Sequence, residues 1–161
     1  MSGIEGTKVS DSQCEVWFYH LERSSLDQVL PELLEKTLGR GWRALVRVRD
    51  GSLMAGLDER LWTWRADSFL PHAAAGGEAD AQQPILLTQG VGNPNGAQAL
   101  FVVDGAETGD LSGYERCLVL FDGRDEAAVA EARERWKQVK ATGAPASYWR
   151  QNEEGAWSRA A

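Results

Sequence analysis

The sequence predicts one α/β domain organised around a mostly parallel sheet, and two observations support this fold class. First, strand-like and helix-like segments alternate through residues 15–64 in the order strand, helix, strand, helix, which favours parallel strands joined by right-handed crossovers. Second, a chain of 161 residues, 43% of them hydrophobic, can bury one sizeable core and does not require a second. We therefore expect residues 1–161 to form a single domain, with residues 1–13 as a flexible N-terminus.

The first half of the chain contains two predicted strands, each followed by a helix. The aromatic and β-branched run EVWFYHL suits a buried strand, and Ser24 and Ser25 are good N-caps for the leucine-rich helical segment that follows. An alternating segment then predicts a second strand, Asp50 and Gly51 predict a turn, and leucines at helical spacing predict a second helix. These elements are expected at residues 15–21, 26–38, 42–49 and 52–64.

The second half predicts three more strands, one long helix and a tail. The small and polar segment 73–83 is expected to be a surface loop, and residues 111–115 a short helical turn. The turn-rich segment GVGNPNG at 90–96 joins two strands as either a hairpin or a tight crossover. The aromatic tail from Ala144 is expected to pack back as a strand or hairpin. The strands are expected at residues 84–89, 99–104 and 116–121, and the helix at 124–142.

The charge of the chain limits the partners it can bind. A formal net charge of −7 and a pI of about 4.9 argue against strong direct nucleic-acid binding, because the whole molecule repels phosphate backbones. Cys14 and Cys117 lie far apart, which suits reduced thiols better than a disulfide framework. No apolar run reaches membrane-spanning length and no signal peptide is recognisable, so we expect a cytoplasmic protein without membrane association.

Motifs for common enzyme and cofactor chemistry are absent or poorly matched. The third glycine of GVGNPNG comes one position late for a dinucleotide fingerprint, and a strand follows where the phosphate-binding helix should begin. The chain has no P-loop motif and no G-x-S-x-G hydrolase motif. Its two histidines, His20 and His72, and two cysteines show no zinc-ligand spacing. We therefore expect no catalytic residues, no metal and no cofactor.

A basic stripe that contains an aromatic residue is one candidate binding site. Four residues of the predicted helix 124–142 recur at i, i+3, i+4 and i+7, so they share one helical face. An ordinary core position is an equal alternative for the aromatic residue, and an ordinary solvated face is the alternative for the cations. The four residues are Arg133, Trp136, Lys137 and Lys140.

A second aromatic stretch, LDERLWTWRADSFLPH at 57–72, presents Trp62 on a helix and Phe69 in the following loop. Burial of Trp62 under the loop, and a purely anchoring role for Phe69, are the structural alternatives. We expect this stretch to meet the basic stripe in space. The two would then form a small pocket, apolar at the bottom and cationic at the rim, that captures an acidic peptide tail.

Six sequence strings resemble the chi subunit of bacterial DNA polymerase III holoenzyme in order and spacing: FYHL, LPELLEKTLGRGWRALV, the LDERLWTW and DSFLPH pair, QPILLT, VDGA and LFDGRDEAAVAEARERWKQVKATG. The resemblance covers about residues 15–157. It implies a three-layer α/β/α domain, Rossmann-like but without a phosphate-binding loop. It also implies a non-catalytic accessory of the clamp loader in DNA replication, which binds the acidic, phenylalanine-terminated C-terminal tail of the single-stranded DNA-binding protein. In some members a small psi subunit tethers chi to the clamp loader.

Carried over by motif, the resemblance places the tail-binding pocket on Trp62, Phe69, Arg133 and Trp136, with Lys137 and Lys140 nearby. Some members have a tyrosine where Trp136 stands here, and a lysine one helical turn before Arg133. Val129 occupies that second position in this chain, so Lys137 or Lys140 would have to replace the missing cation.

Two rival functions remain open from the residues alone. A nucleotide-binding protein or enzyme would use the C-terminal edge of the parallel sheet, near Gly51, Gly105 and Gly123. Direct DNA binding would use an arginine-rich segment, which the net charge disfavours. That segment contains Arg40, Arg43, Arg47 and Arg49.

Overall fold

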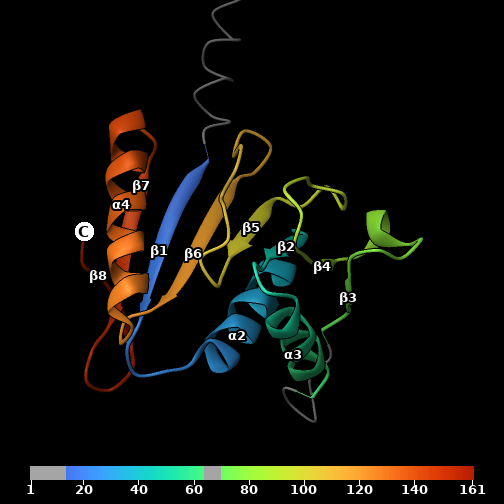
Figure 1. Ribbon diagram of the computed structural model, residues 1–161, viewed down its shortest axis with the longest axis horizontal. Helices are drawn as coiled ribbons and strands as arrows, with labels where there is room; N and C mark the ends of the chain where they lie inside the picture. The colour runs from blue at the N-terminus through green and yellow to red at the C-terminus, as the bar shows by residue number, and fades with distance from the viewer. Residues whose placement is uncertain (1–13, 64–69) are drawn as a thin grey trace, which may run out of the picture.

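The computed structural model describes residues 14–63 and 70–161. They form one eight-stranded sheet with helices on both faces (Figure 1). The expectation for residues 1–13 lies outside the described residues. The strands are β1 (Glu15–Leu21), β2 (Ala44–Arg47), β3 (His72–Ala74), β4 (Ile85–Thr88), β5 (Ala99–Val102), β6 (Arg116–Asp122), β7 (Ala146–Gln151) and β8 (Trp157–Arg159). The helices are α2 (Leu26–Gly39), α3 (Gly51–Trp62) and α4 (Glu126–Thr142), with a short 3-10 helix at Asp80–Gln82.

The strand order is β3-β4-β2-β5-β6-β1-β7-β8, and every neighbouring pair is parallel except β7 and β8. This confirms the predicted α/β fold with a mostly parallel sheet. Strand β2 lies between β4 and β5, so the segment 90–96 belongs to a crossover and not to a hairpin. The aromatic tail does pack back as a hairpin, because β8 pairs with β7 in the antiparallel direction.

Alternating side chains of the strands divide the core into two layers. On β1, Tyr19 and Leu21 pack with residues of α2 and α3, whereas Val16 and Phe18 pack with residues of α4. Helices α2 and α3 therefore cover one face of the sheet and α4 covers the other. Helix α3 contacts β3 and β4, while α4 contacts β6, β1 and β7. These two helices therefore also pack near different ends of the sheet (Figure 1).

Three local predictions differ from the structure. Residues 73–74 of the expected surface loop belong to β3, which pairs in parallel with β4. Alanine-rich composition hid this short edge strand, since its ladder uses backbone groups that any residue supplies. Residues 111–115 form a turn without a helix, with Tyr114 N donating to Leu111 O. The second strand is shorter than expected and spans only Ala44–Arg47.

Helix α4 begins and ends at residues whose chemistry stabilises helix termini. The Asp125 side chain accepts hydrogen bonds from the backbone N–H groups of Ala127 and Ala128, and Gly143 ends the helix at a φ of 81°. We expect Asp125→Ala to lower the free energy of unfolding by about 1 kcal/mol in urea denaturation. Glu126→Ala is the matched control, and equal losses from the two variants would contradict the capping role.

Candidate functional site

An aromatic cluster lies where α4 crosses β1 and β7. The ring of Trp136 packs edge-on against Phe18, with centroids 5.4 Å apart, and against Tyr148, with centroids 5.7 Å apart. Phe18 is fully buried, whereas Trp136 and Tyr148 are half-buried. Trp136 therefore contributes to the core and also to the surface, which combines the two alternatives that the sequence left open. We call Phe18, Trp136 and Tyr148 the α4 aromatic cluster.

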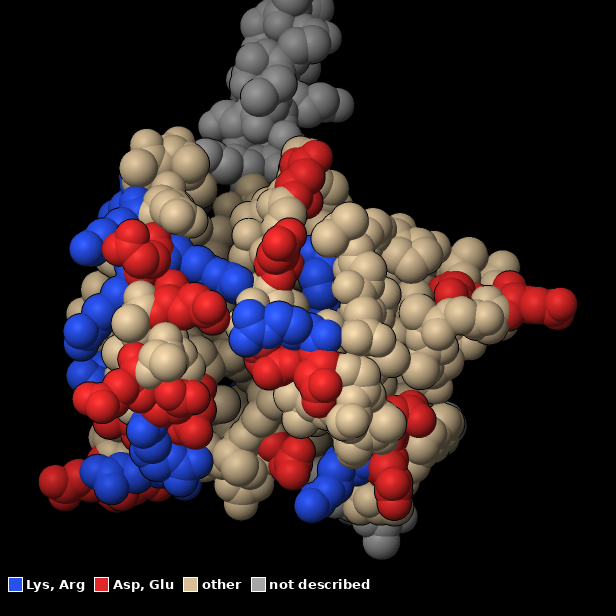
Figure 2. Space-filling view, in the orientation of Figure 1, with Lys and Arg blue, Asp and Glu red and all other residues tan. Residues whose placement is uncertain are grey.

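Exposed cations surround this cluster. The Lys140 ammonium lies 5.5 Å from the centroid of the Trp136 ring, and Lys137 pairs with Glu134 at 3.5 Å. Among the described residues, Arg133 makes no hydrogen bond or ion pair, so its guanidinium can bind an anion without breaking an internal pair. Figure 2 shows Lys and Arg side chains along the outer margin of α4, interleaved with Asp and Glu. The basic stripe predicted from the sequence is thus present, with acidic groups beside it.

Strand residues extend this site beyond what the sequence predicted. His20 Nδ1 lies 2.7 Å from the Tyr148 hydroxyl, and the Arg150 guanidinium binds both carboxylate oxygens of Glu22 at 3.0 Å. Burial, more than any other cause, lowers the pKa of His20 and raises that of Tyr148, and the charges of Arg150 and Arg133 lower both. Arg133 and Arg150 therefore both act electrostatically on the His20–Tyr148 pair.

The lowered pKa of His20 predicts a pH-dependent contribution to stability. Because the folded state disfavours protonation, this contribution is complete above about pH 6.5 and is lost as the pH falls towards the folded-state pKa. When the pH is lowered from about 7.5 to about 5.5, the free energy of unfolding should fall in both proteins. We expect it to fall less in His20→Gln than in the original chain. Measurements stop above the range in which Glu22, whose pKa is also lowered, would add its own loss. A His20 pKa above 6.5 by NMR titration would contradict this assignment.

The structure does not bring Trp62 to the α4 aromatic cluster. Trp62 lies at the end of α3, is 50% exposed, and contacts His72, with ring centroids 4.1 Å apart. Since α3 and α4 cover opposite faces and different ends of the sheet, the expectation that one pocket contains both Trp62 and Arg133 is wrong. The half-exposed Trp62 is not a buried residue, and most of the loop that follows it lies outside the described residues. Phe69 lies outside the described residues.

The four arginines considered for DNA binding do not form one basic surface. Arg47 is buried and donates to backbone carbonyls, and Arg43 donates to two others. The Arg40 guanidinium lies 4.3 Å from the ring centroid of Trp42, while Arg49 lines a crevice at the carboxyl ends of the strands. Three of the four are thus engaged within the protein, so they provide no shared surface for a phosphate backbone.

The crevice that Arg49 lines is where Rossmann-like folds place their ligands. It is a cavity of about 460 Å³ at the carboxyl ends of β1, β5 and β6. Its charge does not suit a nucleotide, because five carboxylates and only three guanidiniums line it. The Asp125 side chain also occupies N–H groups at the start of α4 that could otherwise bind a phosphate.

No group of three or more potential metal ligands was found within residues 14–63 and 70–161. A search of the same described segments found no helix long and apolar enough to cross a membrane.

Comparisons with known proteins identify related sequences. A family model described as "DNA polymerase III chi subunit, HolC" matches residues 14–147. A "DNA polymerase III subunit chi" of Pseudomonas aeruginosa is 38% identical over 69 residues, which cover 43% of this chain and 46% of the relative. A "Probable DNA polymerase III subunit chi" of Rickettsia prowazekii is 27% identical over 85 residues, covering 53% and 52%. The chain thus spans about half the length of each of these relatives.

Proposed function

Because the chain belongs to the DNA polymerase III chi subunit family, we propose that it is a non-catalytic accessory subunit of the clamp-loader assembly in DNA replication. It links the replicase to single-stranded DNA-binding protein by capturing that protein's acidic C-terminal tail, and it acts in the cytoplasm. Family membership supports a role in the polymerase III assembly. The tail-binding step is supported by the geometry of the α4 surface.

One observation carries the choice of site: Arg133, which makes no ion pair among the described residues, lies beside the half-exposed ring of Trp136. An acidic tail that ends in phenylalanine needs an aromatic surface for its last side chain and cations for its carboxylates. Trp136 and Tyr148 supply the first, and Arg133, Lys137 and Lys140 supply the second. Charge-assisted hydrogen bonds to the terminal carboxylate would fix the orientation of the tail.

Arg150 is a further candidate contact for the upstream acids of the tail. Its guanidinium is held by Glu22 in a bidentate pair, so an acidic tail would compete with an internal carboxylate there. Arg133 has no such competitor among the described residues, which makes it the stronger anchor.

Titration of the protein with full-length single-stranded DNA-binding protein, and with the same protein lacking its last residues, tests the proposal. We expect saturable binding that requires the tail and weakens with added salt, because exposed charges are screened over about 8 Å at physiological ionic strength. Several tails on one oligomer should bind more tightly than a single tail peptide, since linkage raises the local concentration. Equal binding with and without the tail would contradict the proposal.

We propose that a psi-type subunit, which would connect this chain to the clamp loader, binds at Trp62. A half-exposed indole at the end of α3 provides aromatic area of the kind that dominates protein interfaces. Because α3 and α4 cover opposite faces of the sheet, both partners could bind at the same time. We expect Trp62→Ala to weaken capture of the psi-containing clamp loader and to leave tail-peptide affinity unchanged. Loss of tail affinity in this variant would contradict the separation of the two surfaces.

A further inference from the structure

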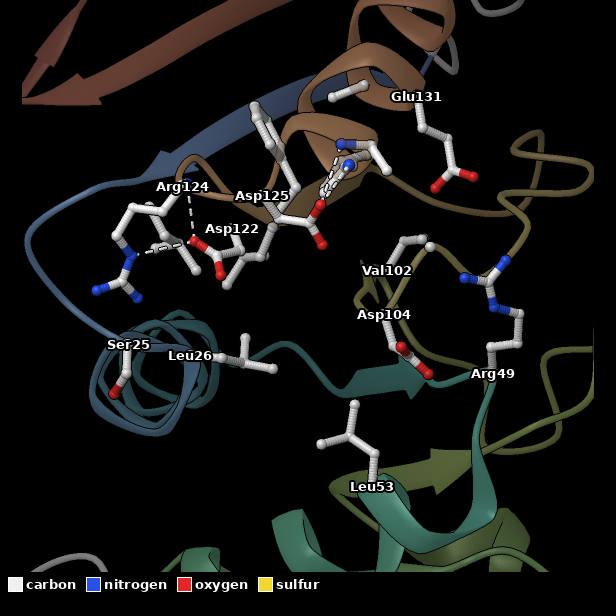
Figure 3. Close-up of a pocket in the computed structure, with 18 of the residues that line it drawn as sticks. Ser25, Leu26, Arg49, Leu53, Val102, Asp104, Asp122, Arg124, Asp125 and Glu131 are labelled. Carbon is white, nitrogen blue, oxygen red and sulfur yellow. Dashed lines mark hydrogen bonds and ion pairs between the residues drawn. The ribbon is translucent and has the colours of Figure 1, made fainter.

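The crevice at the carboxyl ends of β1, β5 and β6 has no role in the proposed capture of the tail. It opens between the first turns of α2 and α4 and has a volume of about 460 Å³ (Figure 3). Apolar side chains from both layers of the core line it, so a ligand that enters can bury hydrocarbon surface. These side chains include Leu21, Leu26, Leu53, Val102, Leu120 and Phe121.

Much of the charge that lines the crevice is already committed to internal contacts. The backbone N–H of Arg124 donates to the Asp122 carboxylate and, together with the Arg124 guanidinium 3.2 Å away, holds the pKa of Asp122 below its usual range. The Arg135 guanidinium donates to the backbone carbonyls of Gly105 and Ala106. The Asp125 carboxylate caps α4.

Two carboxylates keep unused acceptor capacity towards the crevice. Among the described residues, Glu131 makes no hydrogen bond and no ion pair, and Asp104 accepts one bond through Oδ2 from the Asp50 N–H. Figure 3 shows Glu131 and Asp104 near the open centre, with Arg49 on the same side. Two carboxylates, Asp104 and Glu131, therefore remain against the single guanidinium of Arg49, which makes no ion pair among the described residues.

Gly105 keeps Glu131 and Arg49 at the mouth of the crevice. A Cβ at this position would lie 2.7 Å from Glu131 Oε1 and 2.9 Å from Arg49 Nη2, and the φ of +65° disfavours any other residue. The backbone therefore approaches both charged groups closely without filling the space between them. Among the described residues the two groups make no ion pair with each other, although both lie within 3 Å of the same point.

We propose that this crevice binds an organic cation: a primary amine or guanidinium on an apolar stem. The stem would lie against Leu26, Leu53 and Val102, and the cationic group would meet the Glu131 and Asp104 carboxylates. Burial of the stem removes water from the mouth, which strengthens the charge interaction. A phosphate-bearing ligand fits poorly, because the lining carries an excess of negative charge and the start of α4 is already capped.

Three small probes with the same five-carbon stem test the sign of the charge: pentylamine, pentanol and pentanoate. Each is titrated to about 10 mM against the ¹⁵N-labelled full chain, since ligands this small bind in the millimolar range. We expect saturable shifts of amides around the crevice with pentylamine, weaker shifts with pentanol, and none with pentanoate. Equal or stronger binding of pentanoate, or no binding of any probe, would overturn the proposal.

Two variants and a control locate the effect. Glu131→Gln is expected to weaken pentylamine about tenfold, as for a hydrogen bond to a charged group. Glu126→Gln removes the same charge from the exposed first turn of α4, outside the lining, and should change affinity little. Ala127→Trp, at an exposed lining position, should fill the crevice and abolish binding of all three probes. If Glu131→Gln and Glu126→Gln lose equal affinity for pentylamine, the effect comes from net charge alone, and the proposed site would be overturned.

Further probes distinguish the natural source of the cation and the nucleotide alternative. Agmatine represents a free guanidinium metabolite, and a short lysine- and arginine-containing peptide represents a side chain from a protein partner. Tighter binding of one over the other identifies the source, and both outcomes support the same chemistry. AMP is the rival ligand, and stabilisation of the chain by AMP in preference to the amines would overturn the proposal. The tail-binding assay is independent, since the basic stripe does not line this crevice.

Discussion

Arg47→Met is expected to lower the free energy of unfolding by about 3–5 kcal/mol, because it removes several hydrogen bonds from a charged group, each worth about 1.5–3 kcal/mol. Arg47 ends β2 and is only 1% exposed. Its three side-chain nitrogens donate to five backbone carbonyls in two loops that follow β4 and β5, those of Gly90, Val91, Gly92, Glu107 and Thr108. Methionine keeps the apolar stem but removes the hydrogen bonds that hold these two loops to the end of β2.

Arg49→Met is the matched control, since it removes the same charge two residues further along the chain from an exposed position. We expect it to change the unfolding free energy by less than about 0.5 kcal/mol. Urea denaturation followed by circular dichroism gives both values. If Arg47→Met fails to fold, Arg47→Lys still tests the network, because a single ammonium cannot reach both loops and should remain clearly destabilised. A loss below about 1 kcal/mol in both Arg47 variants would show that the loops do not depend on this residue.

Arg47 also shows why sequence analysis failed to assign its role. The segment has arginines at 40, 43, 47 and 49, which is the composition of a basic surface. Nothing in the local sequence distinguishes the buried Arg47 from the other three. The structure buries it because β2 lies in the interior of the sheet, between β4 and β5. That position is set by strand order, which hydrophobic periodicity does not encode. The carbonyl-rich loops that it binds come from segments 43 or more residues away.

Elements defined by local periodicity were predicted well. The leucine spacing of α2 and the charge asymmetry of α4 gave the correct element types within a few residues of the observed ends, because both signals depend on helical geometry alone. The parallel arrangement followed from alternating strands and helices. The edge strand β3 was missed, because its three residues HAA carry no alternating pattern and owe their conformation to pairing with β4.

The sequence predicted which candidate residues share one helix face, but not which elements meet in space. Helical spacing correctly placed Arg133 and Trp136 on one face, but no local signal shows which face of the sheet a helix covers. Trp62 was therefore joined to the wrong partner. His20 and Tyr148 were missed because they lie 128 residues apart and meet only through the pairing of β1 with β7.

Arg133→Ala is expected to weaken binding of a synthetic acidic tail peptide ending in phenylalanine by about 1.5–3 kcal/mol, the range for hydrogen bonds to charged groups. Arg133 is exposed and makes no ion pair among the described residues, so its removal leaves no internal charge unpaired and should not destabilise the fold. The loss can therefore be assigned to the complex. Isothermal titration calorimetry gives the affinity. Because the chain contains seven tryptophans, a fluorescence shift on binding would report contact with the aromatic cluster only if Trp136→Phe removes it.

Two comparisons separate a specific anchor from general attraction. Arg60→Ala removes the same charge from α3, on the other face of the sheet, and should leave affinity nearly unchanged at physiological salt. A peptide that lacks its terminal phenylalanine should bind the original chain weakly, and Arg133→Ala should then cost less, because the two contacts share one bound geometry. Tail affinity that is unchanged in Arg133→Ala, or lost equally in Arg60→Ala, would contradict the α4 site. The acidic tail would then be held by a different surface, whatever the family of the chain.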